Sequence, residues 1–308
     1  MAHKNISSIS KKIINTSCDI SSNSSPEKID FLHTVLCQVG MPRKQTDERI
    51  FERRNGTASV VLEAGRLFKR DQWVDQPLPY GTRPRLIMIH LSSEALHTQS
   101  RTVEIGDSIR DFLQRLCIDT TGGPRGGYTM FRKQMDSLAA CRMLIGMSIS
   151  DRDVTINTQP ISRFESWVQN GRTESSFWPG VIELGQEFYD TLNSHAIPLD
   201  SRALSALKHS ALSLDIYTWL AQRLCRINRP EGNRVSWSNM KDQFGQEYSN
   251  IDSFKQKFKN ALSQVCLVYP EARVEWVQEG FIFETFSSSY QKNTNFHANK
   301  KIIHKSCG

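Results

Sequence analysis

The sequence predicts an α+β protein built from two similar units in tandem, with a flexible arm at each end. Its 308 residues are enough for about two domains. One order of elements (helix, strand, helix, turn, helix and hairpin) can be assigned twice along the chain. Both ends are polar and lack a hydrophobic period, so neither can bury enough apolar surface to fold alone.

The expected boundaries follow these changes in composition. Residues 1–57 are expected to be a flexible N-terminal arm and linker, since Ser, Asn and Lys are frequent at the start and residues 42–57 are highly charged. The first unit is expected over residues 58–176. A connector plus the second unit is expected over residues 177–286, and a basic C-terminal tail over residues 287–308.

The first unit is predicted from hydrophobic periodicity and from the glycine-rich turn DTTGGPRGG at 119–127. The elements expected in order are a helix over 84–98, a strand over 101–106, a helix capped by Asp107, a helix over 128–143 and a hairpin around the turn at 151–153.

The second unit repeats this order with little residue identity. Its expected elements are helices over 200–208 and 210–226, a strand over 234–237, a helix over 238–244 closed by Gly245, a helix over 252–267 and a hairpin across Glu279–Gly280. The order is that of a winged helix-turn-helix, so each unit is predicted to be a winged-helix domain.

The charge is positive and unevenly distributed. The chain has a net charge of +7 and a pI near 9.0. Residues 41–150 and 200–308 each carry +5, and the segment 151–199 between them carries −4. Two basic blocks suit a polyanionic partner, because neutralised phosphates release counterions. A net charge of this size is also compatible with solubility alone.

The helix over 252–267 carries the polar face best suited to duplex DNA. Opposite its apolar side stand Gln256 and Asn260, whose amides can both donate to and accept from an adenine edge. Lys257 and Lys259 flank them and suit phosphates, while Lys255 lies nearer the core and Ser253 nearer the start. A solvated surface helix with the same composition is the alternative.

In the first unit, Thr129, Arg132 and Lys133 point away from the apolar side of the helix over 128–143, and Arg125 precedes it in the glycine-rich turn. In the hairpins, Arg273 and the turn at 151–153 could contact a groove or the DNA backbone; solvated loop charges are the alternative. The candidate DNA contacts are Arg125, Thr129, Arg132, Lys133, Ser253, Lys255, Gln256, Lys257, Lys259, Asn260 and Arg273.

No catalytic, metal-binding or cofactor-binding set is predicted. The chain has no H-x-H pair, as a rolling-circle nicking nuclease would need, and TGGPRGG lacks the Gly-Lys-Ser/Thr of a phosphate loop. The seven Cys have no metal spacing and an odd count, which favours free thiols in a reducing, cytoplasmic compartment. No apolar run is long enough to span a membrane.

Several long segments resemble plasmid-encoded RepA-type replication initiator proteins. They are LPYGTRPRLIMIHLSSEALHTQSRTVEIGDSIRDFLQRL (78–116), TGGPRGGYTMFRKQMDSL (121–138), SALSLDIYTWLAQRL (210–224) with INRP (227–230), and FKQKFKNALSQVCLVYPEARVEW (254–276). The resemblance covers about residues 58–286. It implies binding to repeated sites (iterons) in duplex DNA of a plasmid origin, local melting, recruitment of the host initiator and replicative helicase, monomer–dimer exchange and plasmid copy control.

Three alternatives remain at this point. A DNA-binding transcriptional repressor would use the same helices without a role in initiation. A nicking or priming enzyme would need a catalytic set that the sequence does not offer. A protein–protein adaptor would show no salt-sensitive DNA binding.

Overall fold

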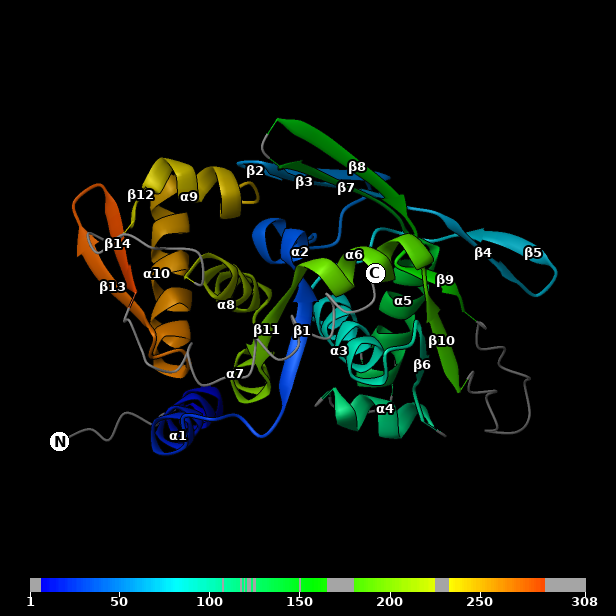
Figure 1. The fold of residues 1–308 in the computed structure, drawn as a ribbon, viewed down its shortest axis with the longest axis horizontal. Helices are drawn as coiled ribbons and strands as arrows, with labels where there is room; N and C mark the ends of the chain where they lie inside the picture. Colours follow the sequence, from blue (N-terminus) through cyan, green and yellow to red (C-terminus); the bar gives the residue numbers. More distant parts are fainter. Residues whose placement is uncertain are drawn as a thin grey trace, which may run out of the picture.

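The computed structural model (Figure 1) describes residues 7–106, 108–116, 118, 120, 123, 126–149, 151–164, 180–224 and 233–285. Its fold is mixed α and β. Within the described part of the chain, no helix combines the length and the apolarity needed to cross a membrane.

The second unit has the elements that the sequence predicts, in the predicted order. They are α8 (Ala211–Leu224), β12 (Asn233–Ser236), α9 (Trp237–Phe244), α10 (Ile251–Val268), β13 (Ala272–Val277) and β14 (Gly280–Thr285). Strand β14 lies between β12 and β13, antiparallel to both. Gly245 closes α9 by donating its N–H to the carbonyl oxygen of Lys241.

The first unit has the same strand arrangement, and its last strand lies beyond the expected boundary at residue 176. Its elements are α3 (Thr82–Thr98), β6 (Thr102–Glu104), α4 (Ile109–Arg115), α5 (Gly127–Ala140), β9 (Ile161–Arg163) and β10 (Val181–Leu184), and β10 lies between β6 and β9. The residue that caps α4 is Ser108, whose Oγ accepts from the N–H of Asp111 at 3.1 Å. Asp107, the expected cap, lies outside the described residues.

The predicted hairpin around the turn at 151–153 forms, but it belongs to another sheet. It consists of β7 (Arg142–Ile149) and β8 (Arg152–Thr158), and β7 pairs with β3 (Ala58–Glu63), which pairs with β2 (Ile50–Asn55). The prediction is therefore right about the pairing of β7 with β8 and wrong about the sheet to which this hairpin belongs. Alternating residues indicate strands, but they do not indicate which sheet the strands join.

The expectation of a flexible arm over residues 1–57 is wrong for residues 7–57. Helix α1 (Ser8–Ser22) buries Ile13 and Ile20 and contacts α10 and α7 (Ser201–Leu207). Strand β1 (Ile29–His33) pairs with β11 (Ala196–Asp200) and leads into α2 (Thr34–Val39). Two isoleucines on a polar helix and a strand partner more than 160 residues away give no local signal. The C-terminal tail lies outside the described residues.

Figure 1 shows the two units in opposite orientations. The sheet β12–β14–β13 lies at the left of the view, with α9 above. The sheet β6–β10–β9 lies at the right, with α4 below. Helices α8 and α3 contact each other between them, and α6 (Gln186–His195) contacts α3. This is the arrangement of an approximate two-fold axis along the view.

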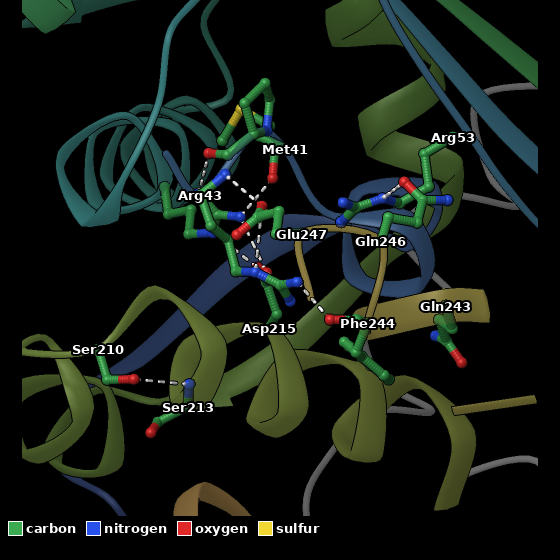
Figure 2. Close-up of polar contacts among 12 residues, drawn as sticks. Met41, Arg43, Arg53, Ser210, Ser213, Asp215, Gln243, Phe244, Gln246 and Glu247 are labelled. Carbon is green, nitrogen blue, oxygen red and sulfur yellow. Dashed lines mark hydrogen bonds and ion pairs between the residues drawn. The ribbon is translucent and has the colours of Figure 1, made fainter. Parts of the chain in front are cut away.

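A buried ion network joins the two units. Arg85 of α3 donates from Nε and Nη2 to the two carboxylate oxygens of Asp215 of α8, at 2.6 and 2.8 Å. Arg43 Nη1 lies 3.9 Å from the same carboxylate, and Arg43 Nε lies 3.4 Å from Glu247 (Figure 2). The Arg85 guanidinium also donates to the carbonyl oxygens of Met41, Pro42 and Gly81. The network therefore ties α3, α8 and residues 41–43 together.

Two buried histidines make the fold sensitive to acid. Burial lowers the pKa of His33 from 6.5 to about 3 and, with neighbouring charges, that of His90 to about 4. Below pH 6.5 these two histidines are therefore protonated in the unfolded chain but neutral in the folded chain. The free energy of unfolding falls as the pH falls. Each histidine contributes roughly 1.4 kcal/mol per pH unit between its folded and unfolded pKa.

We expect His33→Asn to reduce this slope by about one proton between pH 5 and 6. Asparagine can still accept from the N–H of Val35, as His33 Nδ1 does, but cannot titrate. Urea unfolding at several pH values measures the slope, with the exposed His97→Asn as the matched control. An unchanged slope would contradict a neutral His33 in the folded protein.

Candidate nucleic-acid interface

Helix α10 is built as the sequence predicts, except that it begins one residue earlier, at Ile251. The N-cap is Asn250, whose Oδ1 accepts from the N–H groups of Asp252 and Ser253 at 2.7 and 3.5 Å. Its buried face consists of Phe254, Phe258, Ala261, Leu262, Val265 and Val268. Burial of this stripe fixes the rotation of the helix and so determines which side chains face solvent.

The polar side of α10 lies in solvent. Gln256 and Asn260 are both exposed, one turn apart, and Ser253, Lys257 and Lys259 are exposed beside them. Lys255 is half-buried, at the edge of the core as expected. We call the five exposed residues Ser253, Gln256, Lys257, Lys259 and Asn260 the polar face of α10. Its amides and ammonium groups are accessible to a large partner.

Two tryptophans position the lysines of α10, which the sequence reasoning missed. Trp237 of α9 and Trp276 of β13 stack at 6.1 Å between ring centroids. Lys259 Nζ lies 5.4 and 5.5 Å from these two rings. Lys255 Nζ lies 6.0 Å from the Trp237 ring and 3.8 Å from Asp252 Oδ1. Cation–π contacts of this kind orient a lysine without neutralising its charge. The alternation in RVEWV places Trp276 on the same face of β13 as Val274, and this is the signal that the sequence offered.

The hairpin β13–β14 stands next to α10. Arg273 is exposed on β13, and the strand register places it opposite Glu284 of β14.

The corresponding helix of the first unit, α5, offers a smaller polar face. Thr129 Oγ1 donates to the carbonyl oxygen of Gly123 at 2.8 Å, which ties the glycine-rich turn to the helix. Lys133 is exposed and Arg132 is half-buried. Asp136 forms an ion pair with Lys69, which belongs to β4 (Arg66–Lys69). Arg125 lies outside the described residues. Strand β4 thus covers part of the side of α5 that the sequence places in solvent.

The described residues contain no group of three or more His, Cys, Asp or Glu side chains arranged to hold a metal ion. Of the thiols they include, Cys37 and Cys141 are buried, Cys266 is half-buried and Cys18 is exposed. Burial raises the pKa of Cys141 to about 12 and that of Cys266 to about 11, so these two stay protonated at neutral pH.

Comparisons with known proteins identify the family. A search of curated protein sequences gives no match. Among solved structures, a selenomethionine crystal structure of domains 2 and 3 of RctB is similar, with a TM-score of 0.47 and 10% identity, over 81% of this chain and 96% of that one. The model of the family described as plasmid-encoded RepA protein matches residues 78–243, more than half of the chain. The chain therefore belongs to this family, the RepA-type replication initiators.

Proposed function

We propose that the protein binds repeated sequences (iterons) in the duplex DNA of a plasmid origin, and that both units are winged-helix domains. The observation that carries the proposal is the exposed polar face of α10, in a unit where α10 follows α9 and precedes the hairpin β13–β14. In winged-helix proteins the helix in this position enters the major groove. Gln256 and Asn260 would then contact base edges, and Lys257 and Lys259 the phosphates on either side.

The second half of the proposal concerns α5. Its exposed Lys133, with Arg132 beside it, would contact a neighbouring part of the same duplex. The opposite orientation of the units in Figure 1 supports one DNA molecule facing both helices. Two recognition helices on successive turns would cover about 20 bp. The Arg85–Asp215 ion pair would keep the separation of the two helices constant.

Membership of the RepA family supports the remaining roles. They are melting of the origin, recruitment of the host initiator and replicative helicase, exchange between monomer and dimer, and activity in the cytoplasm. We propose that the protein performs them without catalysis and without a cofactor. Nicking of supercoiled origin DNA by the purified protein would contradict this part of the proposal.

Footprinting of purified protein on the DNA that flanks its own gene tests the proposed function. We expect several protected sites of the same sequence, each covering about 20 bp. A single protected site that overlaps the promoter would favour the alternative, a transcriptional repressor without a role in initiation. Absence of any salt-sensitive protection would favour a protein–protein adaptor.

The lysines of α10 give the electrostatic prediction. Replacing Lys257 and Lys259 together with alanine should weaken binding to every duplex and reduce the slope of log K against log salt by roughly two units, about 0.9 for each lost phosphate contact. Fluorescence anisotropy at several salt concentrations measures the slope. Lys11→Ala, on the exposed side of α1 outside the two units, is the matched control. A slope that does not change would remove these lysines from the phosphate interface.

A further inference from the structure

A two-stranded hairpin outside both three-stranded sheets carries an exposed aromatic pair. It consists of β4 and β5 (Gln72–Asp75), and the register places Phe68 directly opposite Trp73. The turn between the strands holds Arg70 and Asp71 at φ 48° and 61°. Two residues in the left-handed region form the tight turn that matches the twist of a hairpin. Figure 1 shows the hairpin projecting at the upper right of the molecule.

The base of the hairpin is fixed to the body of the protein. Arg49 donates to the carbonyl oxygens of Gln76 and Ala64, both at 2.9 Å, and lies 3.3 Å from Asp75. Gly65 lies so close to the end of α5 that a Cβ there would be 2.0 Å from the carbonyl oxygen of Ala140. The ion pair of Lys69 with Asp136 attaches the inward side of the hairpin to α5. These contacts hold the hairpin in a fixed position against the body of the protein.

The outward side of the hairpin exposes the two rings. Phe68 is 55% exposed and Trp73 is 67% exposed, and their ring centroids lie 5.6 Å apart, edge to face. Leu67, which points to the other side, packs against the core. The contact between the two rings stabilises the hairpin, and it also leaves two large aromatic side chains accessible to a partner.

Two arginines lie on the same hairpin as the aromatic pair. They are Arg66, which forms an ion pair with Asp75 at 2.9 Å, and Arg70, which is followed by Asp71 in the turn. Lys133 is exposed on α5, the helix to which the inward side of the hairpin is attached. Aromatic rings flanked by cations stack on bases of any sequence while the cations contact the backbone. A second copy of this chain is a poorer occupant, since a stable interface buries about 800 Å² on each partner, far more than two rings supply.

We propose that Phe68 and Trp73 stack on unpaired bases of a single DNA strand, released when the origin melts beside the duplex held by α5. This inference rests on the proposed function, because it needs an origin that melts. The hairpin then has a role distinct from duplex recognition. It binds the separated strand and so opposes reannealing of the origin.

The test compares two double substitutions in the full chain. Phe68→Leu with Trp73→Leu keeps apolar side chains but removes stacking, whereas Phe68→Tyr with Trp73→Phe keeps aromatic rings. Anisotropy of a labelled oligothymidylate of about 16 nucleotides measures single-strand binding. We expect the leucine pair to weaken it tenfold or more and the aromatic pair to retain it. Ile50→Ala, an exposed apolar residue on β2, is the control and should bind normally.

The affinity for the duplex site is measured in parallel, so that failure of this proposal can be distinguished from failure of the proposed function. Duplex binding by the leucine pair should remain within about twofold of the parent protein. Unchanged single-strand binding by the leucine pair, or equal loss in the tyrosine–phenylalanine pair, would overturn the stacking role. Loss of self-association in sedimentation, with single-strand binding retained, would assign the surface to a second copy. Failure of the parent protein to bind its duplex would instead overturn the proposed function.

Discussion

Asp215→Ala is expected to destabilise the protein by about 3–5 kcal/mol, because removing one partner of a buried ion pair leaves the other charge uncompensated. The Asp215 side chain is only 6% exposed, and it is the acceptor for Arg85, whose side chain is 5% exposed. Arg43, equally buried, lies on its other side. Burial and the charge of Arg43 already lower the pKa of Arg53 to about 10, so this region holds concentrated positive charge.

Urea unfolding measures this loss, and two further variants identify its cause. Asp215→Leu combined with Arg85→Met should restore part of the lost stability, since an apolar pair replaces both charges while the carbonyl oxygens of Met41, Pro42 and Gly81 still lose their donor. Glu247→Ala removes the partly exposed carboxylate of the same network and should cost less than Asp215→Ala, because Arg43, the charge left behind, keeps Asp215 and the carbonyl oxygen of Phe244 as partners. Equal losses for Glu247→Ala and Asp215→Ala would contradict a dominant role for Asp215.

The same network gives a consequence for DNA binding. If Arg85 and Asp215 hold the two units at a constant separation, the leucine–methionine double variant should tolerate changes in site length that the parent protein does not. Binding to sites with one or two base pairs inserted at the centre measures this tolerance. The parent protein should lose affinity on each insertion, because an added base pair rotates one half of the site around the helix axis.

Gln256→Ala and Asn260→Ala are expected to cost on the order of 1–3 kcal/mol each on the cognate site, with little change on random DNA. Both amides are exposed, one turn apart on α10, so neither truncation removes a buried group. Competition binding against cognate and random duplexes separates the two affinities. Ser263→Ala, on the same helix beyond the polar face, is the matched control. Equal loss on both duplexes would show that these amides do not contact bases.

The second unit could be predicted from the sequence because its signals are local. The spacing of Phe254, Phe258 and Val265 determines which side of α10 is buried, and therefore that Gln256 and Asn260 are exposed. The turn at Glu279–Gly280 determines the last hairpin. Lys259 was predicted to be exposed as well, but its contacts with Trp237 and Trp276 depend on three elements meeting in space.

The fold of the N-terminal region and the sheet that the β7–β8 hairpin joins could not be predicted, because the pairing partners are remote in sequence. Strand β1 pairs with β11, and β7 pairs with β3, which an intervening helix-rich stretch separates from it. Helix α1 buries only Ile13 and Ile20. The partial covering of α5 by β4 has the same origin, since Lys69 and Asp136 are 67 residues apart. Non-local pairing of this kind leaves no period in the sequence.

Site-specific photocrosslinking tests most directly whether both units face one duplex. A photoreactive amino acid at position 256 or position 133, with position 50 as the control, is irradiated in complex with a single iteron duplex. We predict crosslinks from positions 256 and 133 to bases about one helical turn apart, roughly 10 bp, and none from position 50. Crosslinks from position 50 alone, or none from position 256, would contradict DNA recognition by the polar face of α10.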